Sequence, residues 1–166
     1  IGASEGLYML PEGSDQLKPV EGNIPNRLKT ATIGQLFFDI RGKLWIGTWA
    51  NGLFLYDPDN GMYQQIASDQ NTDNPVWSMG HVSDIEEGPD NSIWVSTWGY
   101  GLVQISADLS EFTFYQHDNN NVQSLNGNQV KAIEFDDKGY LWIGMEESGL
   151  DRPLPAESLT NGHFVL

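Results

Sequence analysis

The 166-residue sequence predicts an all-β protein made of one repeated unit, and three observations carry this prediction. First, a tryptophan recurs in a short apolar run with spacings of 49 and 48 residues. Second, a Gly-Leu pair recurs with spacings of 46, 49 and 48 residues. Third, no segment shows a helical hydrophobic period over ten or more residues. A period of this length indicates tandem copies of one supersecondary unit. The tryptophans are Trp45, Trp94 and Trp142, and the pairs begin at Gly6, Gly52, Gly101 and Gly149.

The second copy shows why each unit is expected to contain four strands. Its apolar or alternating runs are Gln35–Asp39, Leu44–Thr48, Leu53–Tyr56 and Met62–Ile66. Turn-forming residues rich in Asp, Asn and Gly separate these runs. Loops of two to five residues join antiparallel neighbours, so the unit is predicted to be a meander.

The other copies repeat this pattern with two irregularities. The third unit has runs at Val82–Glu86, Ser92–Thr97, Gly101–Ile105 and Glu111–Tyr115, and the last has runs at Gln129–Phe135, Tyr140–Met145, Leu150–Pro153 and Gly162–Leu166. The third strand of the last unit is doubtful, because Pro153 cannot donate to a ladder. The first unit keeps only Gly6–Leu10 and Gln16–Val20.

Four-stranded meanders repeated radially form a β-propeller. A linear β-solenoid is the alternative, but its coils are shorter, at roughly 20 to 30 residues. The prediction is therefore a partial β-propeller of about four four-stranded antiparallel blades, with the first blade incomplete. The chain is expected to be one domain over residues 1–166, with blades at approximately 1–22, 33–67, 82–116 and 129–166. Since residue 1 lies inside a repeat, we expect a fragment of a larger propeller.

Composition narrows the function classes. The formal net charge is −15 with only eight Lys and Arg, so neither a nucleic acid nor an anionic membrane surface is expected as a partner. Cysteine is absent, which leaves no disulfides and no thiolate metal site. Asp57–Gly61 resembles the opening of a calcium loop, but the distal bidentate Glu is missing, so a turn is expected and no metal or cofactor is predicted.

The stretch Ile133–Gly144, followed by Gly149-Leu150 and preceded by Ser124–Val130, resembles the two-component-regulator propeller repeat. Asp39–Tyr56 matches equally well and Asp84–Leu102 nearly so. The sequence departs from the repeat at two positions, Ser96 in place of Gly and Met145 in place of Thr.

The resemblance implies a ligand-sensing propeller, usually seven-bladed, in the periplasmic part of a membrane-anchored sensor. Such sensors are hybrid histidine kinases or membrane-bound diguanylate cyclases, and their ligands are often carbohydrate fragments. A structural or protein-interaction propeller is the alternative.

The repeated tryptophans and glycines are interpreted as architectural. A tryptophan repeated inside a buried strand fills the core between blades, and a repeated glycine serves turn geometry. This interpretation applies to Trp45, Trp94, Trp142, Gly52, Gly101 and Gly149.

The residues that break the repeat are the candidates for a binding site. Trp49 and Trp98 follow the end of a strand in two units, where the last unit has Glu146, and Asn51 and Tyr100 lie in the same short loops. Loops at one end of a propeller converge on the mouth of its central channel. Aromatic faces beside amides suit a sugar, because CH faces stack on rings and hydroxyls bond to amides. These loops are therefore predicted to bind an oligosaccharide.

Two further readings of these aromatic residues stay open. The indoles of the short loops could simply cover the edges of the blades. Trp77 and His81, in the second long connection, form a weaker candidate site for which packing is the alternative.

Catalytic residues are not evident. His81, His117 and His163 are isolated from one another, and no nucleophile elbow, His-Glu-x-x-His or phosphate loop is present. A polysaccharide-active pair of carboxylates would need only nearness in space, so an enzyme is retained as the less favoured alternative.

Partners follow from the blade count. At about 48 residues per blade, a seven-bladed ring needs roughly 340 residues, so four blades would form an open arc with an apolar face at each end. We expect such an arc to associate with a second copy or with the remaining blades.

Overall fold

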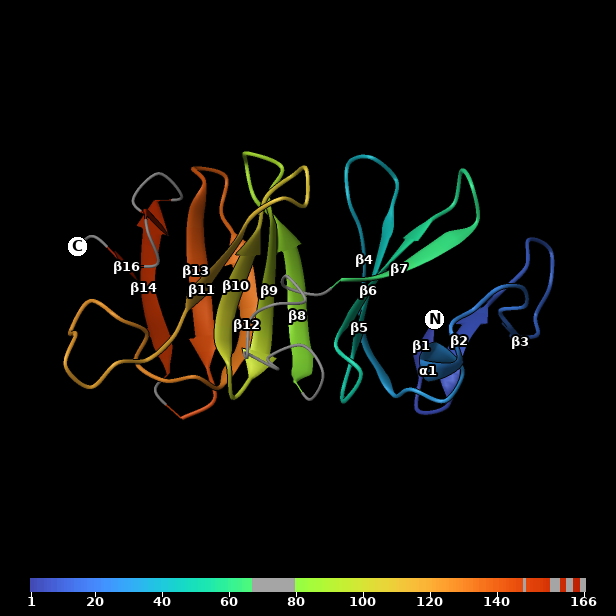
Figure 1. Ribbon diagram of the computed structural model, residues 1–166, viewed down its shortest axis with the longest axis horizontal. Helices are drawn as coiled ribbons and strands as arrows, with labels where there is room; N and C mark the ends of the chain where they lie inside the picture. Colours follow the sequence, from blue (N-terminus) through green and yellow to red (C-terminus); the bar gives the residue numbers. More distant parts are fainter. Residues whose placement is uncertain (67–79, 148, 156–158, 161–162, 165–166) are drawn as a thin grey trace. The chain divides into compact units, whose positions relative to one another are not determined.

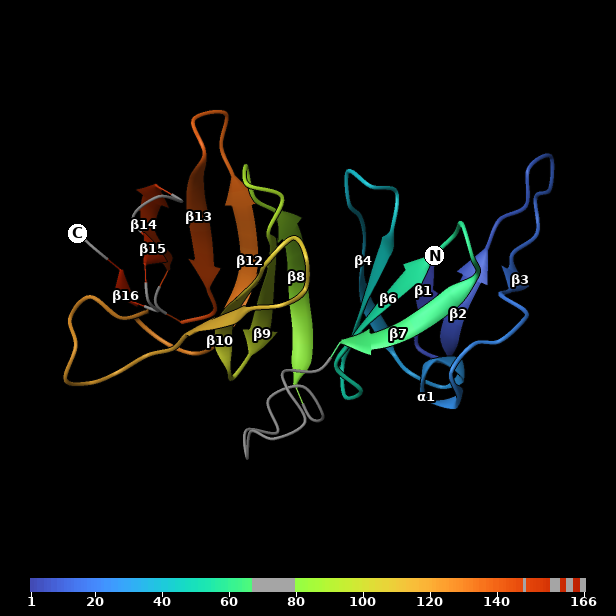
Figure 2. The same cartoon turned by 45° about the horizontal axis from the view of Figure 1, so that its top comes forward.

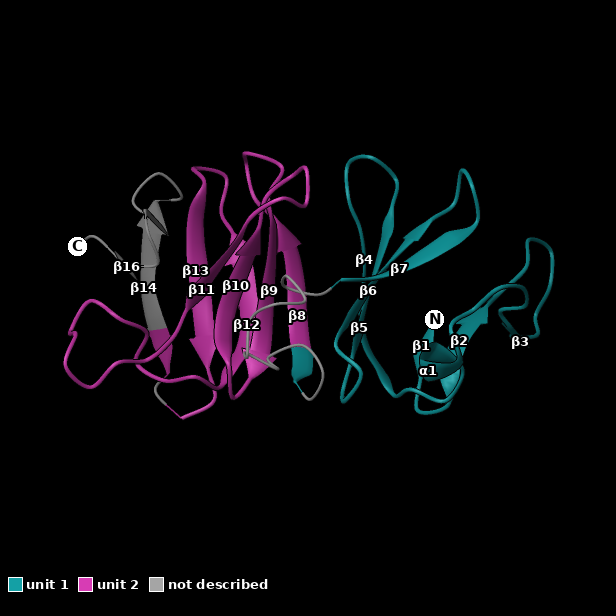
Figure 3. Cartoon of the chain, viewed as in Figure 1, with its two compact units in different colours: residues 1–82 teal, residues 83–166 magenta. Residues whose placement is uncertain are grey.

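The computed structural model describes residues 1–66, 80–147, 149–155, 159–160 and 163–164. The chain divides into two compact units, residues 1–82 and residues 83–166 (Figure 3). Within the described residues, no helix has the length and apolar character needed to cross a bilayer.

The first unit contains a three-stranded sheet and a four-stranded sheet, both antiparallel (Figure 1). The three-stranded sheet has the order β1-β2-β3, and the four-stranded sheet has the order β4-β5-β6-β7, so each follows the chain. A single helical turn, α1, lies between them in sequence. The elements are β1 (Gly2–Ala3), β2 (Gly6–Met9), β3 (Lys18–Pro19), α1 (Asn26–Lys29), β4 (Ile33–Phe38), β5 (Leu44–Thr48), β6 (Leu53–Asp57) and β7 (Met62–Ile66).

The second unit repeats the meander. Sheet β8–β11 has four strands and sheet β12–β14 has three, and β12 lies beside β9 (Figure 2). The first two residues of β8 belong to the first unit. The elements are β8 (His81–Glu87), β9 (Ile93–Trp98), β10 (Gly101–Ile105), β11 (Phe112–Tyr115), β12 (Val130–Phe135), β13 (Tyr140–Met145), β14 (Leu150–Pro155), β15 (Leu159–Thr160) and β16 (His163–Phe164).

These sheets confirm the predicted all-β, blade-repeat fold and correct it in two places. The doubtful third strand of the last blade is present as β14, and its pairing with β13 shifts register between Leu141 and Ile143. Pro153 lies opposite this irregularity, where a ladder donor is not required. The strand predicted at Gly162–Leu166 does not extend this sheet within the described residues. Instead, β16 pairs with β15.

In two blades, the turn between the first two strands is closed by a carboxylate. In the second blade, Asp39 accepts backbone N–H bonds from Arg41 and Lys43 and the indole N–H of Trp45 at 3.1 Å. In the last blade, Asp136 accepts the same set from Lys138, Tyr140 and the indole of Trp142. The carboxylate therefore ties the turn to the first tryptophan of the next strand.

The third blade reaches the same result with different residues. Gly88 stands where the other blades have Asp, and a Cβ there would lie 3.0 Å from the indole nitrogen of Trp94. Ser92 supplies the acceptor instead: its Oγ receives the indole N–H at 2.9 Å and donates to Asp90 at 2.6 Å. The tryptophan anchor is thus kept although the carboxylate is replaced.

Each unit has an apolar core between its two main sheets. The first core joins the two sheets and α1, and its buried members are Leu7, Ile24, Leu28, Ala31, Ile33, Ile46 and Phe54. The second is built around Trp94, which stacks on Tyr115 at 5.4 Å and meets Phe135 edge-on at 6.0 Å. Of the repeated tryptophans, Trp45 and Trp94 are fully buried and Trp142 is half-buried.

The repeated glycines lie in turns with positive φ, at +74°, +75° and +77° for Gly52, Gly101 and Gly149. At Gly101 a side chain is also excluded by space, because a Cβ would lie 2.2 Å from the carbonyl oxygen of Tyr115.

We expect Trp94→Ala to destabilise the chain by about 3 to 5 kcal/mol, because it removes a fully buried indole from the second core. Trp98→Ala, at a position 39% exposed, should cost much less. Urea unfolding of both variants tests this, and equal small losses would contradict the core assignment.

We expect Asp39→Ala to cost on the order of 3 kcal/mol, because it leaves the buried indole N–H of Trp45 and two backbone donors without their acceptor. Asp59→Ala, an exposed carboxylate of another turn, is the matched control and should change stability by no more than about 0.5 kcal/mol. Burial alone would raise the pKa of Asp39, but bonds from Lys43, Arg41 and Trp45 outweigh it and lower the pKa. The stabilisation should therefore be present above pH 4 and be lost as pH falls through the lowered pKa. Equal losses in the two variants would refute this role.

Candidate functional site

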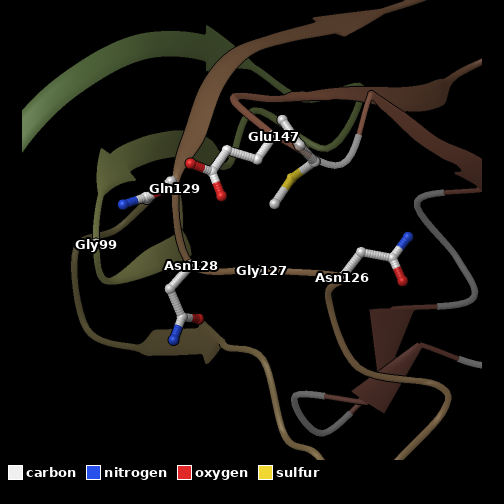
Figure 4. A pocket seen from close by; sticks show the side chains of 7 residues that line it. Gly99, Asn126, Gly127, Asn128, Gln129 and Glu147 are labelled. Carbon is white, nitrogen blue, oxygen red and sulfur yellow. The ribbon is translucent and has the colours of Figure 1, made fainter.

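A polar cavity of about 320 Å³ lies in the second unit (Figure 4). Its lining residues are Gly99, Asn126, Gly127, Asn128, Gln129, Met145 and Glu147. Figure 4 shows the carboxylate of Glu147 on one side and the segment Asn126–Asn128 on the other. The lining offers carboxamides, one carboxylate and a thioether, which is a surface suited to hydrogen bonding rather than to nucleophilic chemistry.

Three segments meet to form this cavity. The segment Asn126–Gln129 leads into β12 and is called the lead-in. It runs between the β9–β10 turn and the β13–β14 turn. The carbonyl of Asn128 accepts the N–H groups of Gly99 and Gly101 at 2.8 and 2.9 Å. The carbonyl of Gln129 accepts the N–H of Glu146 at 3.1 Å. Backbone bonds on both sides therefore hold the lead-in in place.

A partly exposed tryptophan lies next to one of the lining residues in the chain. Trp98 precedes the lining residue Gly99 and forms an isolated β-bridge with Gln129. The ammonium of Lys131 lies 5.9 Å from the centre of the Trp98 ring. The same ammonium forms an ion pair with Glu146 at 2.5 Å. Trp98 is nevertheless 39% exposed, so these contacts do not cover its indole completely.

The loop that leads into the cavity is closed by His117. Its ring nitrogens lie 2.6 Å from the carbonyl oxygen of Leu125 and 3.0 Å from Oδ1 of Asn119. Its backbone N–H donates to Oδ1 of Asn128 at 2.7 Å. Two oxygen acceptors are best satisfied by an imidazolium, and the pKa of His117 is raised by the Leu125 bond, then the Asn119 bond, with a further contribution from the nearby carboxylate of Asp118.

The structure places the sequence-predicted site residues in two groups, one in each unit. In the second unit, Trp98 and Tyr100 flank the lining residue Gly99, and the backbone N–H of Tyr100 bonds to Thr97. Trp77 lies outside the described residues.

In the first unit, the indole of Trp49 is 53% exposed and lies 4.7 Å, ring to ring, from His81. Asn51 occupies the same turn, where its carbonyl accepts a bond from Gln65. His81 is the first residue of β8 rather than part of the connection before it, and burial lowers its pKa.

Sequence reasoning missed Asn126, Gln129 and Glu147. Only Glu147 had a signal, since its neighbour Glu146 interrupts the repeat where two other units have Trp. The two amides lie in a connection whose composition is that of an ordinary loop, and only the fold brings them to the cavity.

A perturbed carboxyl lies elsewhere in the second unit. Burial, then the carboxylates of Glu134 and Asp84, raises the pKa of Glu86 to about 7. The carboxylate of Asp84 is itself held, because its Oδ2 accepts the backbone N–H of Ile133 on β12 at 3.0 Å. Glu86 is not among the residues that line the cavity.

Comparison with known families supports the repeat assignment. The family described as Two component regulator propeller matches residues 124–147. This segment contains β12, β13 and the lead-in that forms one wall of the cavity, so the resemblance drawn from the sequence is confirmed here. No curated protein matches the chain.

Solved structures extend the likeness to most of the chain. The extracellular domain of the putative hybrid two component system BT3049 from B. thetaiotaomicron has a TM-score of 0.71 at 21% identity, over 93% of this chain and 18% of that one. The extracellular domain of the putative one component system BT4673 from the same organism has a TM-score of 0.70 at 22% identity, over 90% and 19%. Selenomethionine-substituted virginiamycin B lyase from Staphylococcus aureus has a TM-score of 0.58 at 16% identity, over 91% and 48%. These likenesses show the propeller-type fold, and the chain spans less than a fifth of the first two proteins.

We expect Glu86→Gln to make the chain more stable at pH 8, by on the order of 1 kcal/mol once solvent screening is allowed for. The folded-state pKa of about 7 exceeds the ordinary 4.5, so wild-type stability from this group is full below pH 4.5 and is lost as pH rises through 7. Urea unfolding between pH 5 and 8 measures the difference. Glu111→Gln is an exposed control, and identical pH profiles for wild type and Glu86→Gln would rule the effect out.

We expect His117 to titrate above 6.5 and His81 below it, which proton NMR can resolve within one protein. Because the His117 pKa is raised, its hold on the loop should be complete below pH 6.5 and weaken as pH rises through the shifted value. Asn119→Ala should move the His117 titration toward lower pH by removing one acceptor. A His117 pKa at or below 6.5 in the wild type would contradict the two hydrogen bonds by which its ring holds the loop.

Proposed function

We propose that the chain is the extracytoplasmic ligand-sensing propeller domain of a bacterial two-component or related signal-transduction receptor, and that it recognises carbohydrate. The cavity of the second unit is the observation that carries this proposal. It presents amide and carboxylate groups for sugar hydroxyls, and Trp98, which precedes the lining residue Gly99 in the chain, supplies a partly exposed indole of the kind on which sugar CH faces stack.

Similarity supports the sensory part of the proposal. The family match and two of the structural neighbours come from regulator propellers and from extracellular domains of putative one- and two-component systems. A sensor needs a site that binds and releases its ligand without altering it, and the lining of the cavity fits that need because it offers hydrogen-bonding groups without a nucleophile and base pair.

The test is a panel of oligosaccharides measured by thermal shift and calorimetry. A ligand that binds the folded state raises the melting temperature by mass action. Trp98→Ala should weaken binding about fivefold, by analogy with the energy of aromatic contacts. Phe38→Ala, an exposed aromatic residue at the β4–β5 turn, is the control that should leave affinity unchanged. A panel without any binder, or an unaltered affinity in Trp98→Ala, would remove this proposal.

Trp49→Ala is the matched indole variant in the first unit. A loss of affinity in Trp98→Ala alone would locate the ligand at the cavity. A loss in Trp49→Ala as well would show that binding is not confined to the cavity of the second unit.

The raised pKa of Glu86 favours a second candidate function, that of a polysaccharide-active enzyme. A carboxyl with a pKa of about 7 beside two other carboxylates is an arrangement that glycoside hydrolysis uses. Release of reducing ends from polysaccharides, abolished in Glu86→Gln, would support that candidate. Binding without release would support the sensor.

A further inference from the structure

We infer that the cavity of the second unit selects its ligand by charge, accepting a neutral saccharide and rejecting its carboxylated counterpart. This inference rests on the proposed function and adds the ligand class. Among the seven lining residues, the carboxylate of Glu147 is the only ionisable side chain.

The basic side chains bonded to the segments around the cavity are already committed, since the ring of His117 bonds to Leu125 and Asn119. Lys131 follows the lead-in by two residues, and its ammonium is paired with Glu146 and lies over the ring of Trp98. An anionic ligand would therefore find no uncommitted counter-charge among the residues that line the cavity. A neutral ligand leaves the pair intact and needs only the hydrogen-bonding groups of the lining.

The surroundings act in the same direction. The chain has 23 acidic and eight basic residues, so its field repels anions as they approach. A second carboxylate placed a few ångströms from Glu147 would weaken binding about tenfold at low salt, with partial screening near the surface taken into account. Because salt screens this field, the difference in affinity between neutral and carboxylated ligands should become smaller as ionic strength rises.

The neutral groups of the lining explain what would be accepted. The carboxamides of Asn126 and Gln129 can each donate and accept, as hydroxyl groups do. The carboxylate of Glu147 can accept hydrogen bonds from further hydroxyls. None of these contacts requires a charge on the ligand.

The experiment compares tetrasaccharides that share one backbone and differ only in charge: cellotetraose and its C6-carboxylated form, together with any neutral binder from the panel and that binder's uronic acid form. Calorimetry at 20 mM and 500 mM NaCl should show about tenfold weaker binding of the carboxylated member at low salt and a smaller difference at high salt.

Glu147→Gln should raise the affinity for the carboxylated member about tenfold relative to the affinity for the neutral member, whatever the loss of one hydroxyl acceptor costs both. Asp137→Asn removes the same charge from the turn at the opposite end of β13 and should not restore binding of the carboxylated member. Equal or tighter binding of the carboxylated member by the wild type would overturn the inference while leaving a carbohydrate sensor in place. Failure of every saccharide to bind would overturn the proposed function itself.

Discussion

The interaction on which three of the blades depend is the hydrogen bond from a tryptophan indole N–H to the turn that precedes its strand. Asp39 and Asp136 accept this bond directly, and Ser92 accepts it in the third blade. Because the same acceptor also binds the turn or its neighbouring carboxylate, one residue fixes both the hairpin and the inward position of the tryptophan. This bond therefore fixes the position of the first residues of the second strand. Because the strand is regular, the loop at its other end also has a defined position.

This arrangement separates structural from functional positions along a blade. The clamped turns lie at one end of the second strand, and the loops that hold Trp49, Trp98 and Glu147 lie at the other end. Because the indole hydrogen bond fixes one end of the second strand, the loop at the other end can differ in sequence from blade to blade. The cavity forms at such variable loops, where the lead-in to β12 contributes the backbone bonds of Asn128 and Gln129.

Much of the fold could be predicted because its signals are local. The strands β5 and β7 have the bounds expected from apolar runs between Asp and Gly turns. What could not be predicted depends on tertiary pairing. The two-residue strand β1 has too few residues for any pattern, and β16 pairs with β15 rather than with the preceding sheet.

The candidate site shows the same limit. The indole loops stand out in the sequence because they depart from the repeat, and the loop that follows Trp98 contributes Gly99 to the cavity. Asn126 and Gln129 have no comparable signal, since they become neighbours of Glu147 only when backbone bonds join three separate segments. The repeat likewise could not predict that Trp142 is half-buried, because it places Trp142 at the position equivalent to the fully buried Trp94.

The most direct test of the account is a two-dimensional NMR titration of the chain with a neutral oligosaccharide. The account predicts that the amides of Gly99, Gln129 and Glu147 shift, while the indole N–H signals of Trp45 and Trp94 stay in place because the clamped ends do not take part. Shifts concentrated at the turns around Asp39 and Asp136, with the cavity amides unchanged, would contradict it.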